Sequence, residues 1–154
     1  MNDRYLYRGK RVDNGEWVTG NLIQVDKPTG GVGYAIQHDF KPENEKDVSY
    51  ITSKIDPATI GQCTGLRDKN GVLIYEGDIV CKPVNYKGKI HNDVWRGKVC
   101  YDVKKAAFVI KRRTKENKFM LGLFTFNKPS ELEIIGNIHD NPELLKGGGA
   151  SDGI

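Results

Sequence analysis

Short segments in which apolar and polar residues alternate, separated by turn residues, run along most of the chain. The segment Tyr34–Phe40 is an example, because Tyr34, Ile36 and His38 alternate with Ala35 and Gln37. A repeat of two residues is typical of a strand with one buried face. The sequence contains no extended amphipathic helix and no long internal repeat, so the pattern predicts a mainly β protein.

The same alternation and the turn residues between segments place the other strands. The expected strands are Arg4–Arg8, Trp17–Val25, Tyr34–Phe40, Val48–Ile55, Val72–Tyr75, Ile79–Cys81, Gly97–Val103, Phe108–Arg112, Phe119–Phe126 and Leu132–Ile138. Turns are expected at 13–15, 68–71, 76–78 and 104–105, and a polar excursion at 83–93. Around the turn at 104–105, Val99 and Tyr101 should share a face that pairs with Phe108 and Ile110.

The pattern over residues 60–138 predicts a small SH3-like barrel. The strands expected in residues 4–56 would precede this barrel as an N-terminal addition. Glycines such as Gly77 and Gly97 stand where a curled sheet must bend, and β-branched residues would fill its interior. A short helical turn should follow Asp140, with Asp140 or Asn141 as the cap and Pro142 in the first position. The expected organisation is one β domain over residues 1–146 and a flexible tail over 147–154.

The composition suits a polar-surfaced soluble domain. The 154 residues are 38% hydrophobic, and the mean hydropathy is −0.55. Every apolar stretch is far shorter than the roughly 20 residues that span a bilayer, and the first residues lack the apolar run of a signal peptide. Three scattered cysteines, Cys63, Cys81 and Cys100, do not make a disulfide framework. We therefore expect reduced thiols, a cytoplasmic location in a bacterial host cell and no membrane contact.

Two long segments of the chain are specific enough to indicate a family. The first runs from Cys63-Thr64-Gly65-Leu66-Arg67-Asp68-Lys69-Asn70-Gly71 into Ile74-Tyr75-Glu76-Gly77-Asp78-Ile79-Val80, and the second is Glu133-Ile134-Ile135-Gly136-Asn137-Ile138-His139-Asp140-Asn141-Pro142-Glu143-Leu144-Leu145. Both segments resemble the YopX family of bacteriophage and prophage proteins. The openings Tyr7–Arg11 and Gly15–Val18 are also similar, and the chain departs mainly around Lys27–Gly33 and Asn85–Asp93. The resemblance implies a small, mainly β, phage-derived protein with an SH3-like barrel portion, and it supplies no catalytic residues.

The polar residues of these motifs have a structural interpretation. Asp68–Gly71 has the residue types of a tight turn. The carboxylates of Glu76 and Asp78 would accept hydrogen bonds from backbone N–H groups at a corner. Asn137 and Asn141 would form hydrogen bonds with backbone groups in a bend of the chain. The alternative is that Glu76 and Asp78 form a carboxylate pair with a raised pKa, for acid–base or metal chemistry.

The remaining reactive residues do not form a recognisable catalytic pattern. The histidines His38, His91 and His139 and the three cysteines lack the close spacing of zinc ligands, and the glycine runs lack a phosphate-loop context. No serine stands in a nucleophile elbow, although a Cys–His dyad built from distant residues is left open. We therefore expect no metal, no cofactor and no enzyme activity, with an enzyme of unknown class as a rival hypothesis.

Positive charge is concentrated in residues 82–118, which hold 12 of the 24 Lys and Arg residues but only 3 of the 20 Asp and Glu residues. One interpretation is a solvated strand face; the other is a nucleic-acid surface, because aromatic residues interleave with the cations. The candidate nucleic-acid-binding residues are Trp95, Arg96, Lys98, Lys104, Lys105, Lys111, Arg112, Arg113 and Lys115.

The leading functional hypothesis is a non-enzymatic protein that binds a host or phage protein. Nucleic acid is the first alternative partner. A second copy of the chain is the other, because one short segment holds more apolar surface than a strand needs. Its residues are Phe119, Leu121, Leu123, Phe124 and Phe126.

Overall fold

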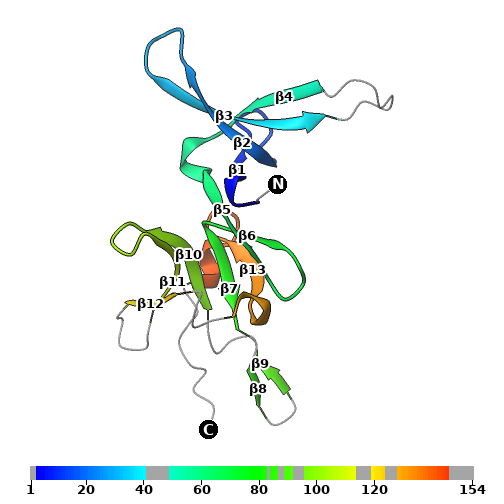
Figure 1. Cartoon of the computed structure of the whole chain (residues 1–154), viewed down its shortest axis with the longest axis vertical. Helices are drawn as coiled ribbons and strands as arrows, with labels where there is room; N and C mark the ends of the chain where they lie inside the picture. Colours follow the sequence, from blue (N-terminus) through cyan, green and yellow to red (C-terminus); the bar gives the residue numbers. More distant parts are fainter. Residues whose placement is uncertain are drawn as a thin grey trace. The chain divides into compact units, whose positions relative to one another are not determined.

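The computed structural model describes residues 3–40, 49–82, 84–86, 89–91, 96–113, 119–123 and 128–145. Antiparallel strands dominate this part of the chain (Figure 1), and the expectation of a mainly β protein is confirmed. The chain divides into two compact units, one up to Cys63 and the other from Thr64. The single domain expected over residues 1–146 stays a prediction, and the tail at 147–154 lies outside the described residues.

The strands follow one another along the chain with short 3-10 helices between some of them. The strands are β1 (Tyr7–Lys10), β2 (Trp17–Asp26), β3 (Val32–Phe40), β4 (Ser49–Lys54), β5 (Gly61–Arg67), β6 (Leu73–Tyr75), β7 (Asp78–Cys81), β8 (Val84–Tyr86), β9 (Lys89–His91), β10 (Arg96–Asp102), β11 (Ala107–Arg113), β12 (Phe119–Leu123) and β13 (Glu133–Asn137). The 3-10 helices are η1 (Asp3–Tyr5), η2 (Pro57–Thr59), η3 (Pro129–Glu131) and η4 (Pro142–Leu145).

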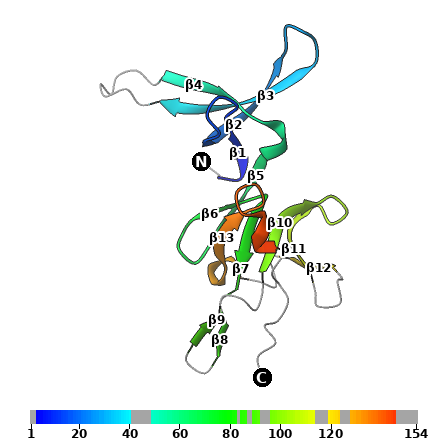
Figure 2. The same ribbon diagram turned by 180° about the vertical axis from the view of Figure 1, so that it is seen from behind.

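The first unit is an antiparallel sheet in which β2 pairs with β1 and β3, and β3 pairs with β4. Figure 2 shows this meander from behind. Ile36 and Ile55 are buried in the unit. Gly20 allows the close approach of β2 and β3, because a Cβ there would run into the Gln37 carbonyl oxygen. The strand β5 begins beside β1 in this unit and continues into the second.

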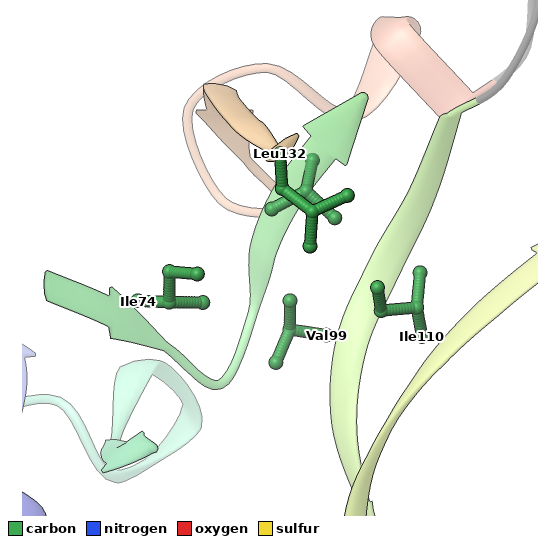
Figure 3. Packing of buried hydrophobic residues seen from close by; sticks show 5 residues of the cluster. Ile74, Val99, Ile110 and Leu132 are labelled. Carbon is green, nitrogen blue, oxygen red and sulfur yellow. The ribbon is translucent and has the colours of Figure 1, made fainter. Parts of the chain in front are cut away.

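The second unit contains a five-stranded sheet in the order β12-β11-β10-β7-β13. Figure 3 shows its core, where side chains from separate strands meet. The core residues, all fully buried, are Ile74, Val80, Val99, Ile110 and Leu132. Strands β10 and β11 supply Val99 and Ile110 as a direct cross-strand pair, which fixes the hairpin over the core.

The register of this hairpin confirms the sequence prediction. Val99 pairs with Ile110, and Tyr101 pairs with Phe108. The Tyr101 and Phe108 rings pack edge to face with centroids 5.4 Å apart. Burial changes along the face, however, because Val99 is fully buried while Tyr101 is 45% exposed and Val103 is 83% exposed. The apolar face of the hairpin therefore begins in the core and ends in solvent.

The strand order does not close this sheet within the described residues, since β12 and β13 are its two edges. The mainly β prediction thus holds, while the SH3-like barrel expected over residues 60–138 stays a prediction.

Several expected boundaries differ from the structure. The strand expected at Arg4–Arg8 is wrong in its first half, because Leu6 N–H donates to the Asp3 carbonyl and the chain forms η1 before β1 begins. The polar excursion at 83–93 contains the paired strands β8 and β9. The expected helical turn is η4, a 3-10 helix.

Candidate functional site

The carboxylate of Asp68 holds a turn and a distant strand together. Asp68 is 5% exposed. Its Oδ1 accepts N–H from Asn70 at 2.8 Å and Val72 at 3.0 Å, and its Oδ2 accepts N–H from Ile134 at 3.2 Å. Burial alone would raise the pKa of Asp68, but the hydrogen bonds from Val72, Ile134 and Asn70 outweigh burial and lower it. This residue therefore acts as an ionised backbone acceptor.

The corner at Glu76-Gly77-Asp78 uses both of its carboxylates in the same way. Gly77 adopts a left-handed φ of 82°, which favours glycine. Asp78 is buried and its Oδ2 accepts the Tyr75 N–H at 2.7 Å, while Glu76 Oε1 accepts the Tyr101 N–H at 3.0 Å. The prediction that these carboxylates accept backbone N–H groups is confirmed. The two acids bond different parts of the backbone, which is the arrangement of a corner rather than of an acid–base pair.

The asparagines of the second motif organise the bend before η4. Asn137 Oδ1 accepts N–H from His139 and Asp140, each at 2.9 Å. Asn141 Oδ1 accepts the Asn137 N–H at 3.3 Å, and a Cβ on Gly136 would lie 2.5 Å from that oxygen. The predicted backbone-bonding role of Asn137 and Asn141 is confirmed. The Asn141 side chain turns back toward Asn137 and stabilises the bend through this hydrogen bond.

The basic residues of β10 and β11 divide between the two faces of the sheet. Side chains alternate across a strand, and Gly97 and Val99 are buried on the core face. Arg96 and Lys98 therefore lie on the opposite face, where Ile79 and Val109 are fully buried, and Lys111 joins them because it pairs directly with Lys98. The structure thus brings three of the predicted nucleic-acid-binding residues together.

The other predicted residues lie elsewhere or outside the described part. Arg112 follows Lys111 and lies on the core side, where a Cβ on Gly97 would be 3.4 Å from the Arg112 Cβ. Lys104 and Lys105 are exposed in the turn after β10, where their N–H groups donate to Asp102 Oδ1 at 2.9 and 3.3 Å. The Arg113 side chain, Trp95 and Lys115 lie outside the described residues. Nucleic-acid binding stays a prediction.

Lys98 and Lys111 stand directly opposite each other in the ladder, a position in which like charges repel each other. Both lysines also act on Cys100, which the alternation of β10 places on the same face as Lys98. Burial raises the pKa of Cys100, and the positive charges of Lys98 and Lys111 oppose that rise.

Beside these lysines the hairpin is hollowed by a pocket of about 400 Å³, which we call the hairpin hollow. Its lining combines apolar, acidic and basic side chains near the β10–β11 turn. The lining residues are Cys100, Tyr101, Asp102, Val103, Lys104, Val109 and Lys111. Sequence reasoning missed the hollow and expected only that Cys100 is a reduced thiol. The signal was the alternation of β10, which places Cys100 between Lys98 and Asp102 on one face.

Comparisons with known proteins identify a family and a similar fold. The family model described as "YopX protein" matches residues 6–146. A solved structure entitled "Crystal structure of protein EF1440 from Enterococcus faecalis" is similar, with 22% sequence identity and a TM-score of 0.51, over 90% of this chain and 96% of that chain. At this identity the similarity shows the fold alone. No curated protein matches the chain. Within the described residues, none of the helices has the length and apolar character needed to span a membrane.

Proposed function

The chain belongs to the YopX family, and we propose that it is a phage- or prophage-encoded protein that acts by binding a protein partner rather than by catalysis. The observation that carries this proposal is the outer end of the β10–β11 hairpin. There the apolar face continues from the core into solvent at Tyr101 and Val103, next to the hairpin hollow. Exposed apolar groups beside a concave surface are characteristic of interaction sites.

The chemistry of the family motifs supports binding over catalysis. The carboxylates of Asp68, Glu76 and Asp78 each accept backbone N–H groups. These hydrogen bonds give each of the three acids a structural task in the corners of the fold. The proposal places the protein in the bacterial cytoplasm, where its three free cysteines would stay reduced.

The proposal is tested by affinity capture with the full chain from host cells, with and without nuclease. A matched variant carrying Tyr101→Ser and Val103→Ser serves as the control, because both side chains are exposed and their loss leaves the core intact. We expect a protein partner that survives nuclease treatment and is lost with the variant. An empty capture, or a partner captured equally by the variant, would overturn the proposal.

A second candidate function is nucleic-acid binding, which the juxtaposition of Arg96, Lys98 and Lys111 on one face favours. Phosphates would neutralise these cations, and binding would weaken steeply with salt. Gel shifts of single- and double-stranded DNA and RNA at increasing salt test this candidate. The double variant Lys98→Glu and Lys111→Glu should abolish any shift, while Lys54→Glu in the first unit should not. A shift that both variants retain would contradict this assignment.

We also propose that the second unit is related to SH3-like barrels. Support comes from its antiparallel sheet of short strands and from the tight glycine corner between β6 and β7. A crystal structure of the full chain tests this relation, and a sheet that stays open would refute it.

A further inference from the structure

We infer that the outer edge of strand β4 binds the β4 strand of a second copy of this chain, in an antiparallel pair centred on Ile51. The inference goes beyond the proposed function, because β4 lies in the first unit and the β10–β11 hairpin lies in the second. It is carried by the direction of the backbone groups of β4, by the symmetry of the open groups about Ile51, and by a contrast with the edge strand β13.

The backbone groups of β4 point alternately toward β3 and away from it. Strand β4 stands at one end of the strand order (Figure 1). Just beyond β4, the Ile55 N–H donates to the Tyr34 carbonyl of β3 at 3.1 Å. In an antiparallel pair every second residue bonds the same neighbour. The odd-numbered residues of β4 therefore bond β3, and the backbone groups of the even-numbered residues point to the outer edge.

The outer edge of β4 is occupied at its C-terminal end and open before it. The Lys54 carbonyl accepts the Val12 N–H at 3.1 Å, which confirms that the even-numbered residues face outward. Among the residues that the structure describes, no group bonds the backbone of Tyr50 or Thr52 on this side. These two residues offer two N–H and two C=O groups to a further strand.

Strand β13 shows how this chain closes an edge. Asp68 Oδ2 accepts the Ile134 N–H, and Asn141 Oδ1 accepts the Asn137 N–H, so side chains occupy the outer donors of β13. No side chain of the described residues does this for β4, and Ser49–Ser53 contains neither a charged residue nor a proline. Charges and prolines are common means by which edge strands avoid pairing. The β4 edge thus favours the addition of a strand.

The open residues are arranged symmetrically about Ile51, which suits a second copy of the chain. With a two-fold axis at Ile51, Tyr50 of each copy would exchange both backbone bonds with Thr52 of the other. The four bonds would use every open group. The two Ile51 residues would form a non-hydrogen-bonded pair, in which side chains approach most closely. Ile51 is 39% exposed, so this contact would cover apolar surface that water now reaches.

The charge next to the open residues permits this pairing. Lys54 is exposed beyond them, and in this register the two Lys54 residues would lie roughly 20 Å apart along the strands. Screening acts over about 8 Å at physiological ionic strength, so the two lysines would not oppose the pair. An extended segment of an unrelated protein is the alternative occupant. The second copy is favoured because symmetry places an apolar side chain of equal size opposite Ile51.

Disulfide cross-linking tests the register. Ile51→Cys and Thr52→Cys, each combined with Cys100→Ser, are oxidised with diamide, while Cys63 and Cys81 are fully buried. The Cα atoms of a non-hydrogen-bonded pair are about 4.5 Å apart, which a disulfide can span. Residue 52 is not opposite its counterpart and points to the other face. We expect Ile51→Cys to cross-link roughly tenfold faster or more. Equal rates, faster cross-linking of Thr52→Cys, or no cross-link would overturn the inference.

Sedimentation equilibrium measures the association itself. The ladder is short, so we expect a dimer that dissociates on dilution, at loading concentrations from about 5 to about 500 µM. Ile51→Lys should weaken association roughly tenfold or more, because two ammonium groups would stand opposite each other. Val25→Lys is the matched control, because Val25 is 40% exposed on the interior strand β2, and it should leave association unchanged. A monomer at every concentration, or equal association of the Ile51→Lys variant, would overturn the inference.

The alternative occupant and the proposed function give distinguishable outcomes. If the chain is monomeric and affinity capture loses its partner with Ile51→Lys but not with Val25→Lys, the edge belongs to an extended segment of that partner and self-pairing is overturned. If capture is empty while the unmodified chain dimerises and Ile51→Cys cross-links, the β4 pair stands and the proposed function falls. If capture depends only on Tyr101 and Val103 and the chain is monomeric, the proposed function stands and the β4 pair falls.

Discussion

Replacing Asp68 tests how strongly one carboxylate joins the turn after β5 to strand β13. Asp68→Ala removes the acceptor for three backbone N–H groups, those of Asn70, Val72 and Ile134. Asp68→Asn keeps one oxygen, which can still serve Asn70 and Val72. Its amide nitrogen is a donor, however, and cannot accept the Ile134 N–H. The two variants therefore remove different parts of the same network.

The magnitude follows from these bonds. A hydrogen bond to a charged group contributes about 1.5–3 kcal/mol, and an unsatisfied buried donor costs about 1–3 kcal/mol. Water can reach part of the turn, so the three losses do not add in full. We expect Asp68→Ala to lower the free energy of unfolding by about 3–5 kcal/mol. For Asp68→Asn we expect a loss of about 1.5–3 kcal/mol. Small domains have only about 5–15 kcal/mol in total.

The effect should depend on pH in one direction. The pKa of folded Asp68 lies below its ordinary value of 3.8. Its stabilising contribution is therefore complete above the pKa of the unfolded chain and disappears as pH falls through the folded pKa. Because protonated Asp68 and asparagine are both neutral, the difference between the original chain and Asp68→Asn should shrink below about pH 4.

Urea unfolding followed by circular dichroism at pH 7 and through a series down to pH 3 measures these differences. Asp26→Asn is the matched control, because Asp26 is exposed at the end of β2 and should leave the urea midpoint unchanged. A loss below about 1 kcal/mol for Asp68→Ala would refute the reasoning, because a single charged hydrogen bond already exceeds it. A gap between the original chain and Asp68→Asn that stays constant into acid would refute the ionised role of Asp68.

Three further predictions concern the β10–β11 hairpin. Gly97→Ala should destabilise the chain by about 1–3 kcal/mol in urea unfolding, because the added Cβ runs into Ile110 Cγ2. Ala106→Gly should raise the free energy of unfolding by about 0.4–1 kcal/mol, because Ala106 has a left-handed φ of 47°. An unchanged or lower urea midpoint would contradict this. Cys100 should react with iodoacetamide before Cys63 and Cys81, at a rate still rising above pH 9, because burial raises its pKa from the ordinary value of 9.0. Peptide mapping by mass spectrometry checks the order, and a rate that levels off near neutral pH would contradict the raised pKa.

Local chemistry explains which parts of the fold the sequence could predict. The turn at Asp68–Gly71 was predictable because an aspartate at its start and a glycine at its end have intrinsic turn preferences, and Gly71 has a φ of 79°. The pairing of Val99 with Ile110 was predictable because a short turn leaves few possible registers. By contrast, the bond from Ile134 to Asp68 joins residues 66 positions apart, and no local preference specifies such a contact.

The candidate site was predictable only in part, because neighbours in a strand face opposite ways. Sequence reasoning grouped Lys111 with Arg112 as adjacent cations, whereas alternation places them on opposite sides of β11. The same rule, applied to β10, would have placed Cys100 on one face with Lys98. The hollow itself is lined by residues of β10, of the turn after it and of β11, a grouping that spacing along the chain does not show.

The motifs that carry the family resemblance and the residues that line the hairpin hollow are different sets, yet they are physically joined. Glu76 Oε1 accepts the Tyr101 N–H, and Gly77 N–H donates to the Val99 carbonyl at 3.0 Å. These two hydrogen bonds hold the backbone of β10 at Val99 and at Tyr101. They therefore fix the point at which the hairpin leaves the core. Side chains beyond that point are free of the packing constraints that act on Val99. The first motif thus holds the platform, and under the proposed function the hairpin tip would determine which partner binds.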